Sequence, residues 1–420
     1  MKRKYFAGSL AAIALLVTTV APATATVGSR HTKPFVIALP VSLSGGNAQV
    51  GQEFLTGLKI WVDMVNNNTG LYAKRRAPKG LLGRKVKLIF DDDQSRSDEA
   101  GKLVTKYISQ LRADFVFPPY GSGSTGVVAS IFKQNNYALI GASAASESIY
   151  SAGFDNMVMA VSSSSKWFAA LPDMVQTAGY KTVSIVTLNN PFTIDSERYL
   201  SKQFAGRKIT VKGIESFSFG NKDFSAIWTK VKAQNPDVVI LQAFGGDAVT
   251  AMKQAAELKI SPKMWAVVAG AWRNDVFVSG VGAATADCVI GDQHWNSKLN
   301  TKGAKEFARA YAKKMGSNPL SGNAGSDGSA AWGFAGGQLL TEALDYLGEA
   351  GLKDQQKIVN FLKSGKVKET ALGKFAVDRR TGINTATEPT LFQFQNGKRV
   401  TISPKSVMEA PVKLPCKPKG

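Results

Sequence analysis

A glycine-rich segment is the first candidate for binding chemistry. Residues 121–126 read Gly-Ser-Gly-Ser-Thr-Gly and match the G-x-G-x-x-G spacing that lets a dinucleotide pyrophosphate approach a helix N-terminus. Pro118 and Pro119 separate this segment from the preceding predicted strand, and the next strand ends in Gly-Ala-Ser, where a ribose-binding carboxylate is needed. We therefore expect no nucleotide cofactor. Backbone N–H groups and hydroxyls at a helix start still suit another anion such as a carboxylate, unless the glycines only shape a tight turn.

Other reactive side chains are few. The acidic run 91–93 resembles a set of metal ligands, but it lies between a strand and a helix start, where a solvated acidic turn is favoured over a calcium site. Trp272 and Arg273 follow a predicted strand, where α/β proteins bind ligands, although packing is an equal alternative. His31 falls in the loose N-terminus expected of the mature chain, and His294 has no evident acid or nucleophile at motif spacing. With only two Cys and two His, we exclude a structural zinc cluster and expect no metal.

The composition is that of a globular protein. The 420 residues include 44% hydrophobic and 20% charged residues, and the formal net charge is +21. The basic residues are spread along the chain and form no arginine-rich arm, so we interpret the charge as a solvated surface and expect no nucleic-acid partner.

The N-terminus predicts export. Lys2, Arg3 and Lys4 precede a mostly apolar stretch over 6–20, and Ala-Thr-Ala at 23–25 fits the small-residue cleavage rule. Residues 1–25 are therefore expected to be a cleaved signal peptide, which places the mature chain in the periplasm. An oxidising compartment permits a disulfide between Cys288 and Cys416, although two separate thiols are equally compatible with the sequence.

The remaining chain alternates strands and helices in two series. The alternation favours parallel sheets covered by helices on both faces, hence an α/β protein with two sheets in succession. The first series predicts strands at 35–41, 86–90, 115–117 and 137–140, with a helix at 125–134 before the last of them. The second predicts strands at 182–188, 209–214, 237–243 and 265–268, alternating with helices at 166–177, 224–233 and 248–258. A strand at 286–291 and helices at 301–315, 330–347 and 355–364 follow, and the chain returns to strand at 373–377 and 390–394.

Several segments occur in the order seen in a known family. They are the opening strand and Ser/Gly loop at 36–46, the strand at 86–89 with Asp91, the loop at 122–125, the strand end at 140–145, the run 236–239 with Phe244, and the segment 373–376 with Asp378. Together with the signal peptide, this set resembles the periplasmic solute-binding proteins of the branched-chain amino acid (Leu/Ile/Val-binding) type.

The resemblance implies a type I periplasmic-binding fold, with two Rossmann-like lobes joined by a three-stranded hinge. It places the N-terminal lobe at 33–160 and 291–367, the C-terminal lobe at 161–290 and 368–402, and a tail at 403–420. The ligand is expected in the cleft between the lobes, with closure by hinge bending and delivery to ABC transporter permease subunits. No second membrane segment is evident in the sequence, and we expect a monomer.

The resemblance also implies particular site residues. The carboxylate-binding serine of the family corresponds to Ser122, with Ser124 and Thr125 beside it. The backbone clamp corresponds to Ser143, Ala144 and Ala145, and two tyrosines of the second lobe correspond to Phe192 and Phe244. The acid that holds the ligand's ammonium group is missing near Gly270, which leaves Asp247 or Asp275 as possible partners.

These correspondences predict a receptor of an ABC importer for a small carboxylate-bearing solute. An apolar, aromatic cleft with Trp272 and Arg273 favours an aromatic or other organic acid over leucine, because an unpaired ammonium in a closed cleft costs several kcal/mol. Amino acids stay open as ligands, and a sensory receptor for a membrane signalling partner is a further alternative. A secreted hydrolase or oxidoreductase is the least favoured hypothesis.

Overall fold

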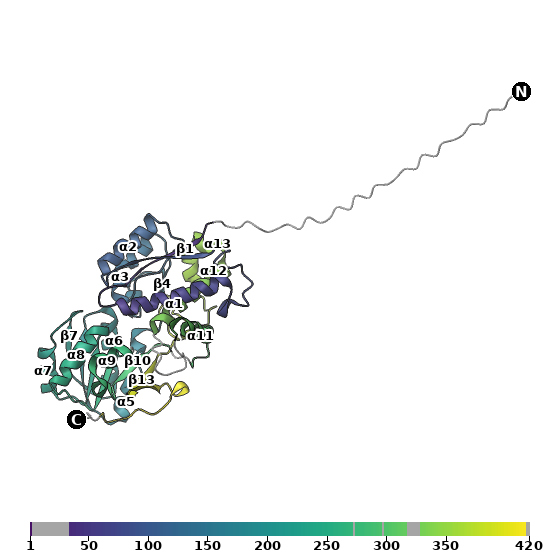
Figure 1. Ribbon diagram of the computed structural model, residues 1–420. Helices are drawn as coiled ribbons and strands as arrows, with labels where there is room; N and C mark the ends of the chain where they lie inside the picture. The colour runs from purple at the N-terminus through teal and green to yellow at the C-terminus, as the bar shows by residue number, and fades with distance from the viewer. Residues whose placement is uncertain (2–32, 272–273, 296–297, 317–327, 417–420) are drawn as a thin grey trace.

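The computed structural model describes Met1 and residues 33–271, 274–295, 298–316 and 328–416, with residues 274 and 275 described by their backbone alone. Figure 1 shows two lobes, one above the other, each with a sheet of its own. Residues 2–25 of the predicted signal peptide, His31, Trp272 and Arg273 lie outside the described residues.

The first lobe is built on a parallel sheet with strand order β2-β1-β3. Its central strand is the apolar run 35–41, which is buried except at Val36, as expected for a strand covered on both faces. The first ten elements of the chain are β1 (Phe35–Val41), α1 (Ala48–Asn67), η1 (Gly70–Tyr72), β2 (Val86–Asp92), α2 (Ser97–Ser109), β3 (Phe115–Val116), α3 (Ser122–Gln134), β4 (Leu139–Gly141), α4 (Glu147–Tyr150) and β5 (Met157–Met159).

Later helices return to this lobe, and α12 packs along α1 (Figure 1). The two backbones come so close that a Cβ atom at Gly57 would lie 1.7 Å from the carbonyl oxygen of Ala330, so only glycine fits there. The Trp61 indole N–H donates a hydrogen bond of 2.9 Å to Thr341 Oγ1 across the same contact. The returning elements are α11 (Ala304–Met315), α12 (Gly328–Leu347), α13 (Glu349–Lys353) and α14 (Gln356–Lys363).

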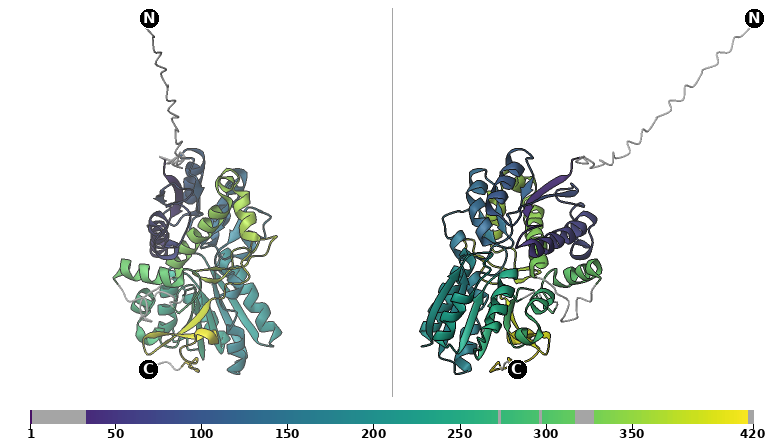
Figure 2. Two further views of the ribbon diagram at one scale, coloured as in Figure 1. Left: turned by 90° about the vertical axis from the view of Figure 1, so that its right-hand side faces the viewer. Right: turned by 60° about the vertical axis from the view of Figure 1, so that its left-hand side comes forward.

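The second lobe holds a seven-stranded sheet in the order β14-β13-β10-β9-β8-β6-β7. Strands β6 to β10 are parallel, whereas β13 and β14 add antiparallel strands at one edge. Figure 2 shows these late strands, in yellow, in the lower lobe with the teal strands. The predicted α/β architecture with two successive sheets is confirmed.

The elements of the second lobe and its connections follow in chain order. They are η2 (Ser164–Lys166), α5 (Leu171–Thr177), β6 (Thr182–Leu188), α6 (Pro191–Gly206), β7 (Thr210–Phe217), α7 (Ser225–Gln234), β8 (Val238–Gln242), α8 (Gly245–Glu257), β9 (Met264–Val268), α9 (Asn274–Val281), α10 (Ala283–Ala286), β10 (Ile290–Gln293), β11 (Glu369–Thr370), β12 (Gly373–Lys374), β13 (Thr390–Gln395), β14 (Lys398–Ser403) and η3 (Lys405–Val407).

Some predicted boundaries differ from the structure. The predicted helix 166–177 is split into η2 and α5, and Pro172 lies in the first turn of α5, where proline is tolerated. The strand predicted at 286–291 begins only at Ile290, because α10 extends to Ala286 and a turn with Cys288 at a φ of 73° follows it. Strand β10 then continues in the second sheet to Gln293, three residues past the lobe boundary predicted at 290. The other predicted lobe boundaries stay predictions.

A disulfide bond between Cys288 and Cys416 fastens the C-terminal tail to the second lobe. Gln393 on β13 reinforces it, since its side-chain amide donates to the Lys413 carbonyl at 2.9 Å and accepts from the Lys413 N–H at 2.8 Å. The tail therefore runs along the outer strands of the sheet as an ordered part of the lobe.

Candidate ligand-binding site

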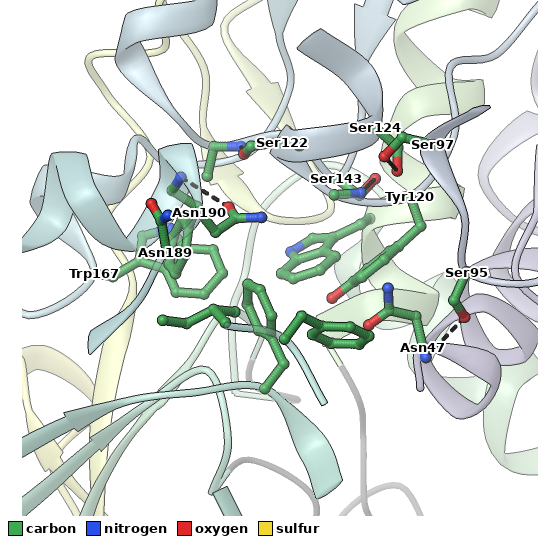
Figure 3. Close-up of a pocket in the computed structure, with 18 residues that line it drawn as sticks. Asn47, Ser95, Ser97, Tyr120, Ser122, Ser124, Ser143, Trp167, Asn189 and Asn190 are labelled. Atoms are coloured by element: carbon green, nitrogen blue, oxygen red, sulfur yellow. Dashed lines mark hydrogen bonds between the residues drawn. The ribbon is translucent and has the colours of Figure 1, made fainter. Parts of the chain in front are cut away.

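A cavity of about 180 Å³ lies between the two lobes (Figure 3). The first lobe lines it with serines from the loops after β2, β3 and β4, and the second lobe lines it with aromatic rings and asparagines that follow β6, β7 and β8. These loops meet because the carboxyl ends of parallel strands share one edge of a sheet. None of the described side chains that line the cavity carries a charge.

The N-terminus of α3 faces this cavity. Helix α3 begins at Ser122 after Gly121, and no side chain caps it. The first N–H groups of a helix have no intrahelical acceptor, so this end favours an anion. In the structure, the helix begins three residues before the predicted start at Thr125 and includes the serines of the glycine-rich segment.

The Ser122 hydroxyl is oriented by two backbone amides. Its Oγ accepts hydrogen bonds from the N–H groups of Ala145 and Ser146, each at 3.0 Å, and the side chain is buried at the cavity wall. A serine hydroxyl has two acceptor sites and one proton. Because both acceptor sites are occupied, the Ser122 proton is left to donate elsewhere, which suits a carboxylate oxygen in the cavity.

Of the other residues predicted to bind the ligand's carboxylate, some line the cavity and some do not. Ser124, Ser143 and Ala145 line the cavity with Ser122. Thr125 and Ala144 do not: the buried Thr125 hydroxyl donates to the Pro119 carbonyl at 3.1 Å, and the buried Ala144 carbonyl accepts from the Tyr150 hydroxyl at 3.0 Å. Both residues hold the loops in shape behind the cavity wall.

The two serines beside Ser122 are also in contact with neighbouring loops. Ser143 Oγ accepts from the Gly121 N–H at 3.2 Å, and Ser124 Oγ lies 2.9 Å from Ser97 Oγ. Hydroxyl groups thus connect the loop after β4 with the start of α3, and α3 with the start of α2.

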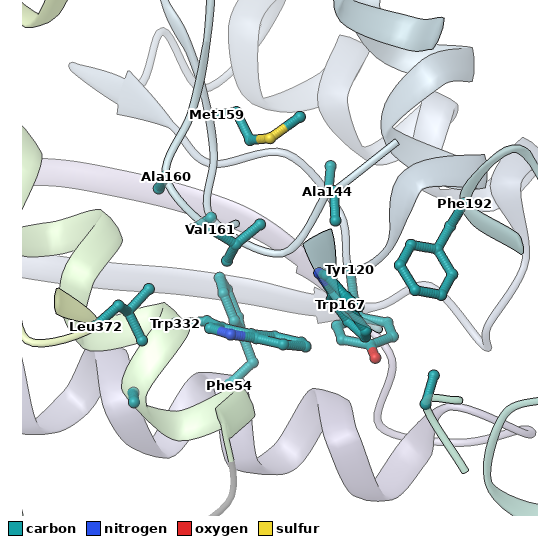
Figure 4. Packing of buried hydrophobic residues seen from close by; sticks show 14 of the residues in the cluster. Phe54, Tyr120, Ala144, Met159, Ala160, Val161, Trp167, Phe192, Trp332 and Leu372 are labelled. Atoms are coloured by element: carbon teal, nitrogen blue, oxygen red, sulfur yellow. The ribbon is translucent and has the colours of Figure 1, made fainter. Parts of the chain in front are cut away.

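Aromatic side chains form the rest of the wall. Trp167 lies 4.3 Å, centroid to centroid, from Phe192, whose ring lies 5.9 Å from that of Phe244. The Trp332 ring stacks with the Tyr120 ring at a centroid distance of 6.3 Å, and its centroid lies 5.9 Å from that of the Trp167 ring (Figure 4). The structure places the predicted Phe192 and Phe244 at the cavity. Four further aromatic residues that line it were not predicted from the sequence: Tyr120, Trp167, Phe219 and Trp332.

The prediction that His294 has no acid partner is wrong. His294 Nε2 lies 2.6 Å from Asp292 Oδ2, and Asp292 Oδ1 accepts a hydrogen bond of 2.6 Å from the Ala269 N–H. Both side chains are buried, and the imidazole ring packs on Trp167 at a centroid distance of 3.6 Å. The pair supports the aromatic wall from behind and does not line the cavity.

The predicted amine partners are not brought to the cavity by any described contact. Asp247 is buried and accepts a hydrogen bond of 3.0 Å from the Gly220 N–H, while burial raises the pKa of its carboxyl group. Asp275 belongs to α9, and its side chain lies outside the described residues, as Trp272 and Arg273 do. Gly270 lines a smaller adjoining cavity of about 60 Å³.

The lobes also touch at the mouth of the cleft. Phe219, which is 47% exposed, lies so close to Gly46 of the first lobe that a Cβ atom there would come within 2.5 Å of the ring. Glycine at position 46 therefore permits the approach of the two lobes at this point.

Comparison with known families decides what kind of protein carries this cleft. A family model described as periplasmic binding protein matches residues 34–398. The chain belongs to this family. The predicted resemblance to the Leu/Ile/Val-binding type and the type I periplasmic-binding fold are confirmed.

Relatives of this periplasmic binding protein cover it almost end to end. It is 22% identical to Leu/Ile/Val-binding protein homolog 7 of Brucella suis, over 96% of this chain and 98% of the relative. Its fold is similar to that of LivJ from Streptococcus pneumoniae, solved with isoleucine (TM-score 0.72, 22% identity, 91% and 100% of the two chains). It is similar, too, to an R. palustris solute-binding protein solved with benzoate (TM-score 0.72, 19% identity, 91% and 98%).

The described residues hold neither a candidate membrane span nor a candidate metal site. None of the helices found there is long and apolar enough to span a bilayer. Nor do three or more His, Cys, Asp or Glu side chains gather in that part of the chain as a metal site would require.

Proposed function

We propose that this periplasmic binding protein is the receptor of an ABC importer and captures a small carboxylate-bearing solute, an aromatic or other organic acid in preference to leucine. The observation that carries the proposal is Ser122, whose hydroxyl accepts from two backbone amides and keeps its proton for an acceptor in the cavity. The uncapped start of α3 adds a favourable field for the same anion.

The uncharged wall argues against a ligand ammonium group. An α-amino acid brings a cation that needs a carboxylate, and none of the described lining side chains is acidic. Leaving that cation unpaired costs several kcal/mol, which a deaminated acid avoids. The aromatic rings favour a flat apolar body, each contact contributing on the order of 1 kcal/mol.

The similar structures show that one fold serves both ligand classes, since one was solved with isoleucine and another with benzoate. Amino acids are the second candidate ligands. The position of Asp247 favours them, because this carboxylate follows Phe244 of the cavity wall by three residues in the chain. Its hydrogen bond to the Gly220 N–H and its place outside the cavity lining favour the organic acid.

The receptor is proposed to act as a monomer in the periplasm, exported by the signal peptide at residues 1–25, with permease subunits as its protein partner. A sensory receptor would use the same cleft, and capture of a membrane partner separates the two roles. We expect neither a cofactor nor catalysis, because Ser122 faces backbone amides instead of a general base.

Mass spectrometry of small molecules released from natively purified protein tests the proposal. We expect an organic acid without an amino group at close to one molecule per chain. Release of leucine, isoleucine or valine at that ratio would contradict it.

A further inference from the structure

The Tyr120 hydroxyl is uncommitted in the binding cavity. Tyr120 is only 9% exposed, lines the cavity, and packs its ring on Trp332. Among the residues that the structure describes, none forms a hydrogen bond with its hydroxyl. Burial and the charge of Asp292 raise the pKa of Tyr120, so the phenol stays neutral and can both donate and accept.

Asn47 presents a second uncommitted polar group to the same space. Its backbone N–H donates to Ser95 Oγ at 3.0 Å, but its side chain neither caps α1 nor bonds to another described group. Figure 3 shows Ser122 at the top of the cavity, Asn47 at the lower right, and the Tyr120 hydroxyl pointing into the middle of the cavity, with the Asn47 side chain beside it in this view. The polar pair and the carboxylate-binding serine are therefore at different ends of the cavity.

The pair also lies where the cavity continues. Tyr120, Asn47 and Phe244 line both the main cavity and the smaller adjoining one of about 60 Å³. This extra space is large enough for a small substituent on a ring, and it is lined by no charged side chain among the described residues.

We propose that Tyr120 and Asn47 form a distal subsite for a hydroxyl group on the ligand, so that the solute is a ring-hydroxylated aromatic carboxylate. The inference rests on the proposed function, in which Ser122 and the start of α3 hold the carboxylate. A phenolic hydroxyl donates and accepts, as do the Tyr120 hydroxyl and the Asn47 amide. An unsubstituted ring would bury both polar groups without a partner, which costs affinity.

Titration calorimetry with benzoate, 3-hydroxybenzoate and 4-hydroxybenzoate tests this inference. We expect at least one hydroxybenzoate to bind the wild-type protein about three- to tenfold more tightly than benzoate. Tyr120→Phe should abolish this preference while changing benzoate affinity less than about twofold, because the ring and its packing are kept. Tyr180→Phe is the matched control, since Tyr180 lies at the opposite end of β6 from the cavity. Asn47→Ala is a second variant, and we expect it to abolish the same preference for a hydroxybenzoate over benzoate.

Two results would overturn the subsite alone: equal affinity for benzoate and both hydroxybenzoates in the wild-type protein, or a preference that survives both Tyr120→Phe and Asn47→Ala. If none of the three acids binds the wild-type protein, the ring-hydroxylated ligand is ruled out, whereas release of leucine, isoleucine or valine from natively purified protein is the result that overturns the proposed function.

Discussion

Ser146 connects Ser122 to the opposite lobe through Asp195. Its Oγ donates a hydrogen bond of 2.5 Å to Asp195 Oδ2 on α6, while its backbone N–H donates to Ser122 Oγ. The Ser148 N–H donates to the same carboxylate oxygen at 2.9 Å. The orientation of Ser122 and the approach of the two lobes therefore depend on one short segment after β4.

Asp195→Ala should weaken ligand affinity about three- to tenfold, because hydrogen bonds from Ser146 and Ser148 to a charged acceptor then no longer favour the closed lobes. Calorimetry gives the affinity, and small-angle scattering should show a smaller compaction on ligand addition than in the wild-type protein. Asp173→Ala is the control, since Asp173 pairs with Arg207 within the second lobe. An effect of the control as large as that of Asp195→Ala would refute the link between the lobes.

Ser122→Ala should lower the affinity for an aromatic carboxylate at least tenfold, because a hydrogen bond to a charged group contributes about 1.5–3 kcal/mol. The Ala145 and Ser146 amides also lose their acceptor, so the melting temperature should fall. Ser124→Ala is the matched control, and we expect it to cost less than about threefold in affinity, because its hydroxyl lies against Ser97. Equal losses in both variants would show that Ser122 has no special role.

The ionised carboxylate of Asp237 is expected to stabilise the folded state to an extent that depends on pH. Burial of the Asp237 carboxyl group opposes its ionisation, but the hydrogen bonds that it accepts from Lys263 Nζ and from the backbone N–H groups of Lys181 and Thr182 outweigh burial and lower its pKa from 3.8 to about 2. The carboxylate thus stabilises the folded state fully above pH 3.8, and the contribution is lost as the pH falls through about 2. Asp237→Asn should cost about 1–2 kcal/mol at pH 6, reduced by solvent screening, and little near pH 2.

Urea unfolding of both proteins at several pH values measures this difference. A cost of Asp237→Asn that is the same at pH 6 and near pH 2 would be inconsistent with the proposed ionisation.

The disulfide should contribute about 2–4 kcal/mol, since it closes a long loop between Cys288 and Cys416. The double variant Cys288→Ser, Cys416→Ser should melt at a lower temperature and be insensitive to reductant, whereas the wild-type protein should lose stability when reduced. Detection of two free thiols in the unfolded, unreduced wild-type protein would rule the bond out.

Sequence periodicity located the regular elements well where apolar runs are continuous. The strands predicted at 35–41 and 182–188 have the same bounds as β1 and β6. Helix α6 was missed, because its large buried apolar side chains are only Phe192, Leu200 and Phe204. A sparse stripe of this kind gives little periodic signal.

The proposed anion-binding end of the site was predictable because a glycine-serine segment before a helix has a local signature. The aromatic wall was not. Trp332 lies in α12, where buried residues occur on every face of the first three turns, so no period marks the one ring that faces the cavity. The Asp292–His294 pair had a weak signal, the two-residue spacing that puts side chains on one face of a strand.

We propose that the cleft binds a carboxylate without an accompanying ammonium group. Calorimetry of the ligand-free wild-type protein with phenylalanine and with 3-phenylpropionate, which differ only in the amino group, tests it most directly. We predict measurable binding of 3-phenylpropionate and at least tenfold weaker binding of phenylalanine, with 4-methylpentanoate and leucine in the same order. Tight binding of phenylalanine or leucine with no detectable binding of the deaminated acids would contradict the account.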